Sequence, residues 1–169
     1  MAFSTQTTVK LHYILSRSAQ SPKISDGSVN VKLSHDKGNR DCNLPRHYVL
    51  IHGLFFGNLA SWYPAFSQTL SQANEVLCYD LRGHGLSEVP KAGYRLENHL
   101  NDLMSLLEEL KWSKQEICFV GHSFGARLAL AALKARHSQF QNQVIDQKLM
   151  GDRIIMIDPP LLTANQEDQ

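Results

Sequence analysis

The 169-residue sequence has only three cysteines, no long apolar run and almost no excess of charge. Cys42, Cys78 and Cys118 are odd in number, far apart and without a C-x-x-C pair, which argues against a disulfide framework or a zinc site. No run of about 18 apolar residues exists, so no membrane-spanning helix is expected. The only apolar patch near the N-terminus, His12 to Leu15, is shorter than the 7–15 residues or so of a signal peptide. These absences predict a cytoplasmic protein.

The charge balance also argues against nucleic acid as a partner. Seventeen Lys and Arg against 16 Asp and Glu give a net charge of +1, so no clustered basic face for nucleic acid is expected. Neither G-x-x-x-x-G-K-[ST] nor G-x-G-x-x-G occurs, so no motif supports nucleotide binding. With 43% hydrophobic and 20% charged residues, the composition is that of a globular protein. We expect one domain over residues 1–169, with neither a nucleic acid nor a membrane as its partner.

Short, continuous apolar runs mark the strands of a central sheet. Such runs suit parallel strands that are covered on both faces. Four segments have this character: residues 47–51, 75–79, 117–120 and 153–157. Two more strands are expected before them, over residues 7–15 and 28–33, where apolar and polar residues alternate. These two look antiparallel.

Helical patterns separate the apolar runs. Apolar residues recur at helical spacing in two segments, and an Ala/Leu-rich stretch has high intrinsic helix propensity. The three segments are residues 62–70, 96–110 and 126–136. Alternating strands and helices predict an α/β fold with a mostly parallel sheet, helices on both faces and two antiparallel strands in front. Residues 1–46 would supply those first strands and loops, and residues 47–160 the core βα units.

The main chemical signal is the G-x-S-x-G pattern Gly121-His122-Ser123-Phe124-Gly125, which joins the third apolar run to the Ala-rich stretch. A strand that turns sharply into a helix strains its central residue, and flanking glycines remove side chains that would block the turn. The Ser123 hydroxyl is then exposed at the positive end of a helix dipole. This pattern predicts a nucleophilic serine. We interpret His122 as structural, because adjacent side chains at such a turn point apart.

A second loop follows the first apolar run at His52 and Gly53. A glycine here lets the backbone bend so that the next N–H groups face the same space as the serine. Acyl transfer needs such preorganised donors for the oxyanion of its tetrahedral intermediate. The donors would be the backbone N–H groups of Leu54 and Phe124. From this loop alone, an ordinary glycine turn remains the alternative, and residues 80–87 by themselves are interpreted as a structural loop.

Three segments in this order, His52-Gly53, YDLRGHGLS (79–87) and VGHSFGA (120–126), resemble the α/β-hydrolase superfamily. The likeness covers roughly residues 48–160 and is greatest to single-domain carboxylesterases and lactonases with a mobile cap. It implies Ser123 as nucleophile, Leu54 and Phe124 as oxyanion donors, and residues 80–87 as an active-site wall. A serine at the elbow speaks against the dehalogenase and epoxide hydrolase branches. The implied substrate is a small acyl compound, whether ester, thioester, lactone, amide or C–C bond, and no metal or cofactor is implied.

The sequence supplies no evident base for this serine. In this fold the triad order is Ser, then Asp or Glu, then His. The only histidine after Ser123 is His137, which would lie about 21 Å away along one continuous helix, whereas a base must come within about 3 Å. Five of the histidines before Ser123 lie near the start of the chain, on the amino-terminal side of the sheet, or at family positions that are not the base: His12, His35, His47, His52 and His84.

The triad acid is equally open. Asp158 is the tentative acid, because a few members of the superfamily keep theirs at the end of this strand, although most place it one strand later. Asp146, Asp152 and Asp168 have no supporting context. By the same likeness the last two strands, the usual acid and the histidine are missing, so we expect a truncated hydrolase chain whose last apolar run is a bare sheet edge.

Three hypotheses follow from the sequence. The first is a serine hydrolase of the ester-cleaving type, inactive or weak as this 169-residue chain. The second is a non-catalytic binding module that self-associates or pairs with another chain through the exposed sheet edge. The third is an unstable by-product without a function.

Overall fold

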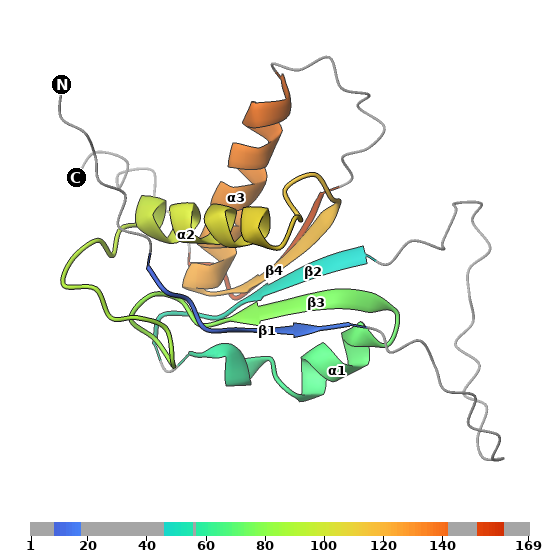
Figure 1. The fold of residues 1–169 in the computed structure, drawn as a ribbon, viewed down its shortest axis with the longest axis horizontal. Coiled ribbons are helices and arrows are strands. Elements are labelled where there is room, and N and C mark those ends of the chain that lie inside the picture. The colour runs from blue at the N-terminus through green and yellow to red at the C-terminus, as the bar shows by residue number, and fades with distance from the viewer. Residues whose placement is uncertain (1–8, 18–45, 56, 142–151, 161–169) are drawn as a thin grey trace, which may run out of the picture.

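The computed structural model describes residues 9–17, 46–55, 57–141 and 152–160. Strands alternate with helices along most of this part of the chain (Figure 1). In order, the elements are β1 (Tyr13–Ser16), β2 (Arg46–Ile51), the 3-10 turn η1 (Leu59–Ser61), α1 (Ala65–Ser71), β3 (Asn74–Tyr79), α2 (Leu96–Glu109), β4 (Ile117–His122), α3 (Phe124–Gln141) and β5 (Arg153–Ile157).

The strands form one five-stranded sheet in the order β1-β3-β2-β4-β5. β2, β3, β4 and β5 run parallel, and β1 pairs antiparallel with β3. The central strand β2 sets the register, with Val49 beside Leu77 on one side and Phe119 on the other. The predicted α/β class is confirmed, and so is one of the two antiparallel strands. The other, at residues 28–33, lies outside the described residues.

The first strand is shorter than the sequence predicts. We expected a strand over residues 7–15, but it begins only at Tyr13. Just before it, the Lys10 N–H donates to the Glu88 carboxylate and the His12 N–H to Ser87 Oγ, at 3.0 and 2.9 Å. The N–H groups of Lys10 and His12 therefore bond to side chains of a distant loop and do not extend the sheet.

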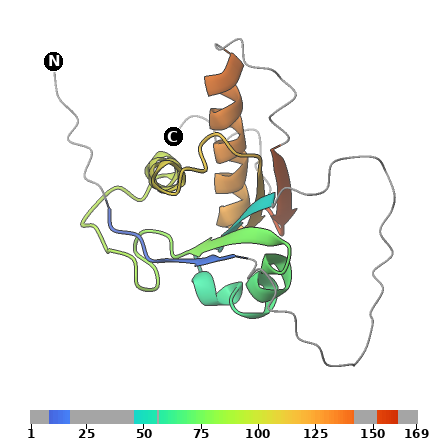
Figure 2. The ribbon, with the colours of Figure 1, turned by 45° about the vertical axis from the view of Figure 1, so that its right-hand side comes forward.

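Helices cover both faces of the sheet, as predicted (Figures 1 and 2). Alternate strand residues separate the two cores, because successive side chains of a strand point to opposite faces. Val49 and Ile51 pack with α2 and α3, and Leu50 between them packs with η1 and α1. Ala126, Ala129 and Ala132 are fully buried, so α3 lies against the sheet along its alanine face.

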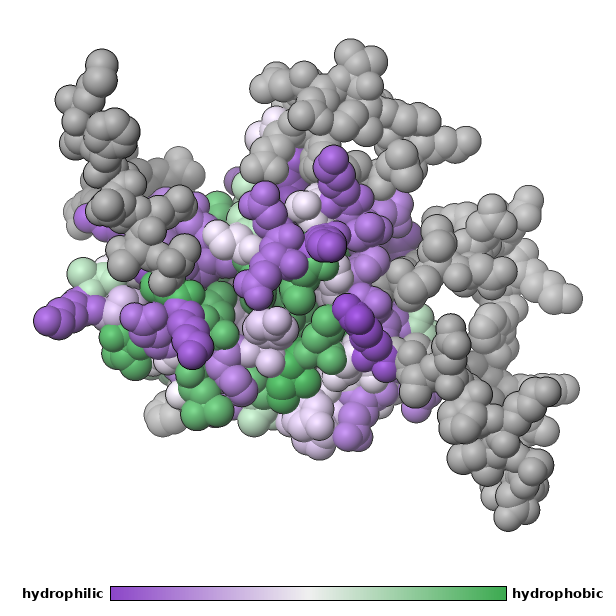
Figure 3. All heavy atoms as spheres, viewed as in Figure 1, coloured by the Kyte–Doolittle hydropathy of each residue, from purple (hydrophilic) through white to green (hydrophobic). Residues whose placement is uncertain are grey.

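The described part of the chain exposes large apolar side chains at several places, and the most exposed is Phe55 in the loop after β2, at 85%. On β5, at the edge of the sheet, Ile155, Met156 and Ile157 are 49%, 46% and 39% exposed, which agrees with the expected bare edge. Leu86 and Val89, in the loop between β3 and α2, are 77% and 73% exposed. In Figure 3, green apolar side chains lie scattered from the left-hand side to the middle of this face, with polar ones between and above them.

Candidate active site

Four loops meet at one edge of the sheet, because parallel strands all end on the same side. The loop of residues 52–57 follows β2, the loop of residues 80–87 follows β3, and Ser123 follows β4 directly. Asp158 follows β5. The structure thus brings together at this edge the segments that the sequence singles out for chemistry.

Ser123 occupies a sharp turn between β4 and α3. Its φ of 53° lies in the left-handed region, which costs a residue other than glycine about 1–3 kcal/mol. The Ser123 N–H donates to the Ile157 carbonyl at 2.9 Å, so the β4–β5 ladder continues up to the turn. Its own carbonyl accepts from the Ala126 N–H at 2.9 Å, within the first turn of α3. The next residue, Phe124, is the first of α3, and its N–H therefore has no partner within the helix.

Two glycines around Ser123 permit close backbone approach. A Cβ on Gly125 would collide with the Ile51 carbonyl oxygen and lie 2.7 Å from the His52 carbonyl oxygen. A Cβ on Gly121 would collide with the Gly125 carbonyl oxygen. A side chain at Gly125 would push α3 away from the end of β2, and one at Gly121 would push α3 away from β4.

Gly53 brings the 52–57 loop against the serine turn. A Cβ built on Gly53 would lie 3.2 Å from the Ser123 Cβ and 3.2 Å from Nδ1 of His122. Gly53 therefore lies close to both Ser123 and the exposed His122. The backbone that follows Gly53 starts directly beside Ser123.

His52 stabilises the start of the loop after β2 through hydrogen bonds of both ring nitrogens. Its Nε2 accepts the Leu81 N–H at 3.0 Å, so its proton is on Nδ1, which donates to the Gly53 carbonyl at 2.8 Å. In a trans peptide the N–H points opposite to the carbonyl, so the Leu54 N–H of the same peptide points away from His52. Burial lowers the pKa of His52 and keeps the ring neutral. With both nitrogens occupied, His52 is a structural residue and not a base.

The 80–87 loop is held by its own charged groups. The buried Asp80 carboxylate accepts from the Leu59 N–H at 2.7 Å, the Leu86 N–H at 3.0 Å and His12 Nδ1 at 2.8 Å. Burial alone would raise the pKa of Asp80, but these hydrogen bonds outweigh it and lower the pKa. Arg82 forms a two-pronged ion pair with Asp102 of α2, with both N···O distances at 2.6 Å. These contacts agree with the structural interpretation of this loop.

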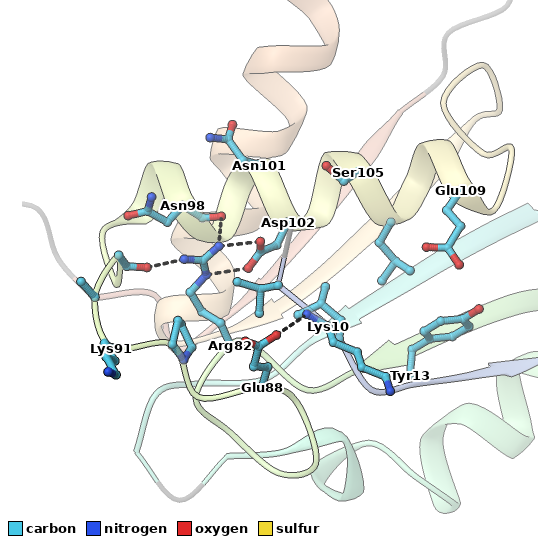
Figure 4. Close-up of a pocket in the computed structure, with 16 residues that line it drawn as sticks. Lys10, Tyr13, Arg82, Glu88, Lys91, Asn98, Asn101, Asp102, Ser105 and Glu109 are labelled. Atoms are coloured by element: carbon cyan, nitrogen blue, oxygen red, sulfur yellow. Dashed lines mark hydrogen bonds and ion pairs between the residues drawn. The ribbon is translucent and has the colours of Figure 1, made fainter. Parts of the chain in front are cut away.

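The hollow drawn in Figure 4 borders the 80–87 loop but does not reach Ser123. Its volume is about 870 Å³, and it lies between residues 9–13, residues 88–93 and helix α2. Its polar lining includes the Arg82–Asp102 pair, and its lining residues include neither Ser123 nor any residue of the 52–57 loop. The hollow therefore gives no information on a substrate of Ser123.

The other histidines lie away from Ser123 or are engaged elsewhere. His47 begins β2 beside Trp112 and Glu75, at the amino end of the strands. His12 lies at the carboxyl edge, because β1 is antiparallel, and there it pairs with Asp80. His137 is exposed on the continuous helix α3, about 21 Å along it from Ser123. None of the hydrogen bonds among the described residues joins a histidine to the Ser123 hydroxyl.

The candidate acids separate by their positions. Asp158, exposed and with φ of 46°, follows Ile157, whose carbonyl accepts from Ser123, so it lies at the same edge as the serine. Asp152, just before β5, buries its side chain fully and pairs with Arg136 at 2.7 Å, at the opposite edge. Asp146 and Asp168 lie outside the described residues. Within the residues that the structure describes, no group of three His, Cys, Asp or Glu could hold a metal ion, and no helix could cross a membrane.

The chain was compared with known proteins. The family model of the alpha/beta hydrolase fold matches residues 47–149. A 2-(acetamidomethylene)succinate hydrolase of Mesorhizobium japonicum is 32% identical over 82 residues, which are 47% of this chain and 29% of that protein. The solved enol-lactonase of Burkholderia xenovorans is 30% identical, with a TM-score of 0.53 over 78% of this chain and 40% of that one.

A third relative shows the fold alone. The structure of Est816, an N-acyl homoserine lactone degrading enzyme, is 24% identical with a TM-score of 0.58, over 89% of this chain and 42% of that chain. The chain thus spans less than half the length of each of these three relatives. The family match, the order of the strands and the turn at Ser123 agree with one another: the chain belongs to the α/β hydrolase fold family.

Proposed function

We propose that this chain belongs to a serine hydrolase that cleaves carboxylic esters or related small acyl compounds, with Ser123 as the nucleophile. The observation that carries the proposal is the left-handed Ser123 at the β4–α3 turn, with the Gly53 backbone packed against its Cβ. The names of two relatives at least 30% identical, a succinate-derivative hydrolase and an enol-lactonase, support hydrolysis of an acyl bond.

In the proposed mechanism, Ser123 Oγ attacks the acyl carbon and loses its proton to a base. The backbone N–H groups of Leu54 and Phe124 stabilise the resulting oxyanion. The intermediate then expels the alcohol, which takes up that proton, and water hydrolyses the acyl-enzyme to the acid. Asp158 is our candidate for the triad acid. Because no hydrogen bond among the described residues joins a histidine to the Ser123 hydroxyl, we propose that this chain alone is weak or inactive, since the members of a triad act as a unit.

The first test is ester hydrolysis by the Ser123→Ala variant. Any hydrolysis of p-nitrophenyl acetate above the buffer rate should disappear in this variant, because the attacking hydroxyl is gone. Ser61→Ala is the matched control, since Ser61 is exposed and lies in η1 rather than at the turn, and its rate should equal that of the parent. Hydrolysis retained in Ser123→Ala would refute the assignment of the nucleophile.

The second candidate function is a binding module that self-associates along β5. The favouring observation is the run of three exposed apolar residues, Ile155 to Ile157, on the edge strand of the described sheet. Unpaired edge strands recruit further strands. Sedimentation at rising concentration should show dimers, and Met156→Lys should abolish them because a charge blocks the apolar edge. Val89→Lys, at an exposed loop residue, is the control; monomers throughout would exclude this candidate.

We also propose that the protein acts in the cytoplasm on a small molecule, without nucleic acid. The support for the compartment comes from the cysteines. Cys78 is buried and forms no disulfide, and burial raises the pKa of its thiol to about 12, so this thiol stays protonated and unreactive. Unpaired thiols are typical of proteins in a reducing compartment.

A further inference from the structure

His84 links two loops of the candidate site through its ring. Its Nε2 lies 2.9 Å from the Leu54 carbonyl oxygen, and its Nδ1 lies 3.0 Å from the Arg82 carbonyl oxygen. The first contact reaches the 52–57 loop across 30 residues of sequence, and the second returns to the 80–87 loop. The ring is half-buried and stacks at a tilt on His52, with 5.2 Å between the ring centroids. His84 thus holds the peptide that follows the Leu54 N–H.

The chemistry of these two contacts selects one form of the ring. A carbonyl oxygen only accepts hydrogen bonds, and a neutral imidazole has a single N–H. A neutral His84 would donate to one carbonyl and turn a lone pair toward the other. Only the imidazolium, with an N–H on each nitrogen, donates to both.

The charged and titratable groups around His84 come from three elements. His52 lies in the 52–57 loop, with the Asp80 carboxylate near it, and His99 lies on α2, near the Arg82–Asp102 ion pair. Burial lowers the pKa of both His52 and His99, so both rings are neutral around pH 7. Arg82 is already neutralised by Asp102. Neither neighbouring histidine therefore opposes a positive charge on His84.

We infer that His84 is a positioning residue for acyl transfer: as an imidazolium it bridges the Leu54 and Arg82 carbonyls and holds the Leu54 N–H in place for the oxyanion. This inference rests on the proposed function, because it assigns Leu54 as an oxyanion donor. The bridge needs an N–H on each ring nitrogen, because a neutral ring would leave one of the two carbonyls without a donor. His52 fixes the Gly53 carbonyl and His84 the next one, so two histidines hold successive peptides of one loop.

The direct test is an NMR titration of the ¹⁵N-labelled full chain between about pH 5 and 8, the range in which histidines change charge. The Phe55 amide nitrogen is bonded to the Leu54 carbonyl carbon, so its shift reports the hydrogen bond to that carbonyl. We expect this shift to follow the titration of the His84 ring in the parent and in the control His137→Gln, and to be flat in His84→Gln. A flat shift in the parent, or an equal titration in His84→Gln, would overturn the inference.

A second arm measures reactivity. His84→Phe keeps a ring without donors and should slow labelling of Ser123 by a fluorophosphonate about tenfold, less than the 10²–10³-fold cost of deleting an oxyanion donor. His84→Gln, which keeps one neutral donor group, should recover part of this loss, and the ratio of parent to Gln rates should fall as pH rises. An unchanged rate in His84→Phe would contradict the positioning role. Should Ser123 not react at all, the chain is the inactive form that the proposed function allows, and the titration of Phe55 alone decides whether His84 bridges the two loops.

Discussion

Asp152→Ala is expected to lower the free energy of unfolding by about 3–5 kcal/mol, the usual cost of leaving one partner of a buried ion pair alone. Arg136 and Asp152 are 1% and 0% exposed, and their charged groups meet at 2.7 Å. Asp152 also accepts the Ile117 N–H at 2.8 Å, and Arg136 donates to the Ser113 and Gln115 carbonyls at 3.0 and 2.7 Å. The ion pair therefore links α3 to the starts of β4 and β5.

Urea unfolding of the parent and the variant measures this loss. The matched control is Arg17→Gln, because Arg17 pairs with Glu75 at 3.4 Å but is 62% exposed, and an exposed pair contributes about 1 kcal/mol or less. The double variant Arg136→Met/Asp152→Leu should recover much of the stability, since it leaves no unpaired buried charge. A loss in Asp152→Ala no larger than that in Arg17→Gln would show that the buried pair does not fasten α3.

His99→Leu is expected to stabilise the protein at pH 7 and to stabilise it further as the pH falls. His99 is 1% exposed on α2, 5.0 Å from the Phe124 ring, and neither ring nitrogen has a hydrogen-bond partner among the described residues. A buried polar group without a partner costs about 1–3 kcal/mol, and leucine removes that cost.

The pH dependence follows from the pKa of His99, which burial lowers from 6.5 to about 4. Between these values the unfolded chain binds more protons at this position than the folded one. The parent therefore loses about 3 kcal/mol of stability through His99 as the pH falls from 7 through 4, and His99→Leu avoids this loss. Urea unfolding at three pH values gives the difference, with exposed His137→Gln as the control. Parallel pH curves for parent and His99→Leu would contradict the assignment.

The buried strands were predictable because each is an apolar run covered on both faces, and no other element accommodates such a run of five residues as simply. The helix after Ser123 was predictable from its alanines, whose small side chains let α3 approach the sheet. The start of β1 was not predictable, because the backbone groups of Lys10 and His12 bond to side chains 78 and 75 residues away. Local alternation carries no information about such partners.

In the candidate site, too, some residues were predictable from the sequence and others were not. Gly53, Ser123 and its flanking glycines have a local signature, since their roles depend on backbone geometry that the motif itself dictates. The double contact of His84 and the burial of His99 have none, because they arise where loops after different strands meet. Asp152 illustrates the same limit: without Arg136 and the Ile117 N–H beside it, nothing in its neighbours along the chain distinguishes it from a surface carboxylate.

The most direct test of the central claim is fluorophosphonate labelling of the native chain, followed by intact mass and peptide mapping. The β4–α3 turn should direct one adduct to Ser123, slowly because no described histidine is hydrogen-bonded to its hydroxyl, and faster than in the urea-denatured chain. Ser123→Ala should carry no adduct. Equal labelling of the native and denatured chain, or an adduct that persists in Ser123→Ala, would contradict the assignment of Ser123 as the nucleophile.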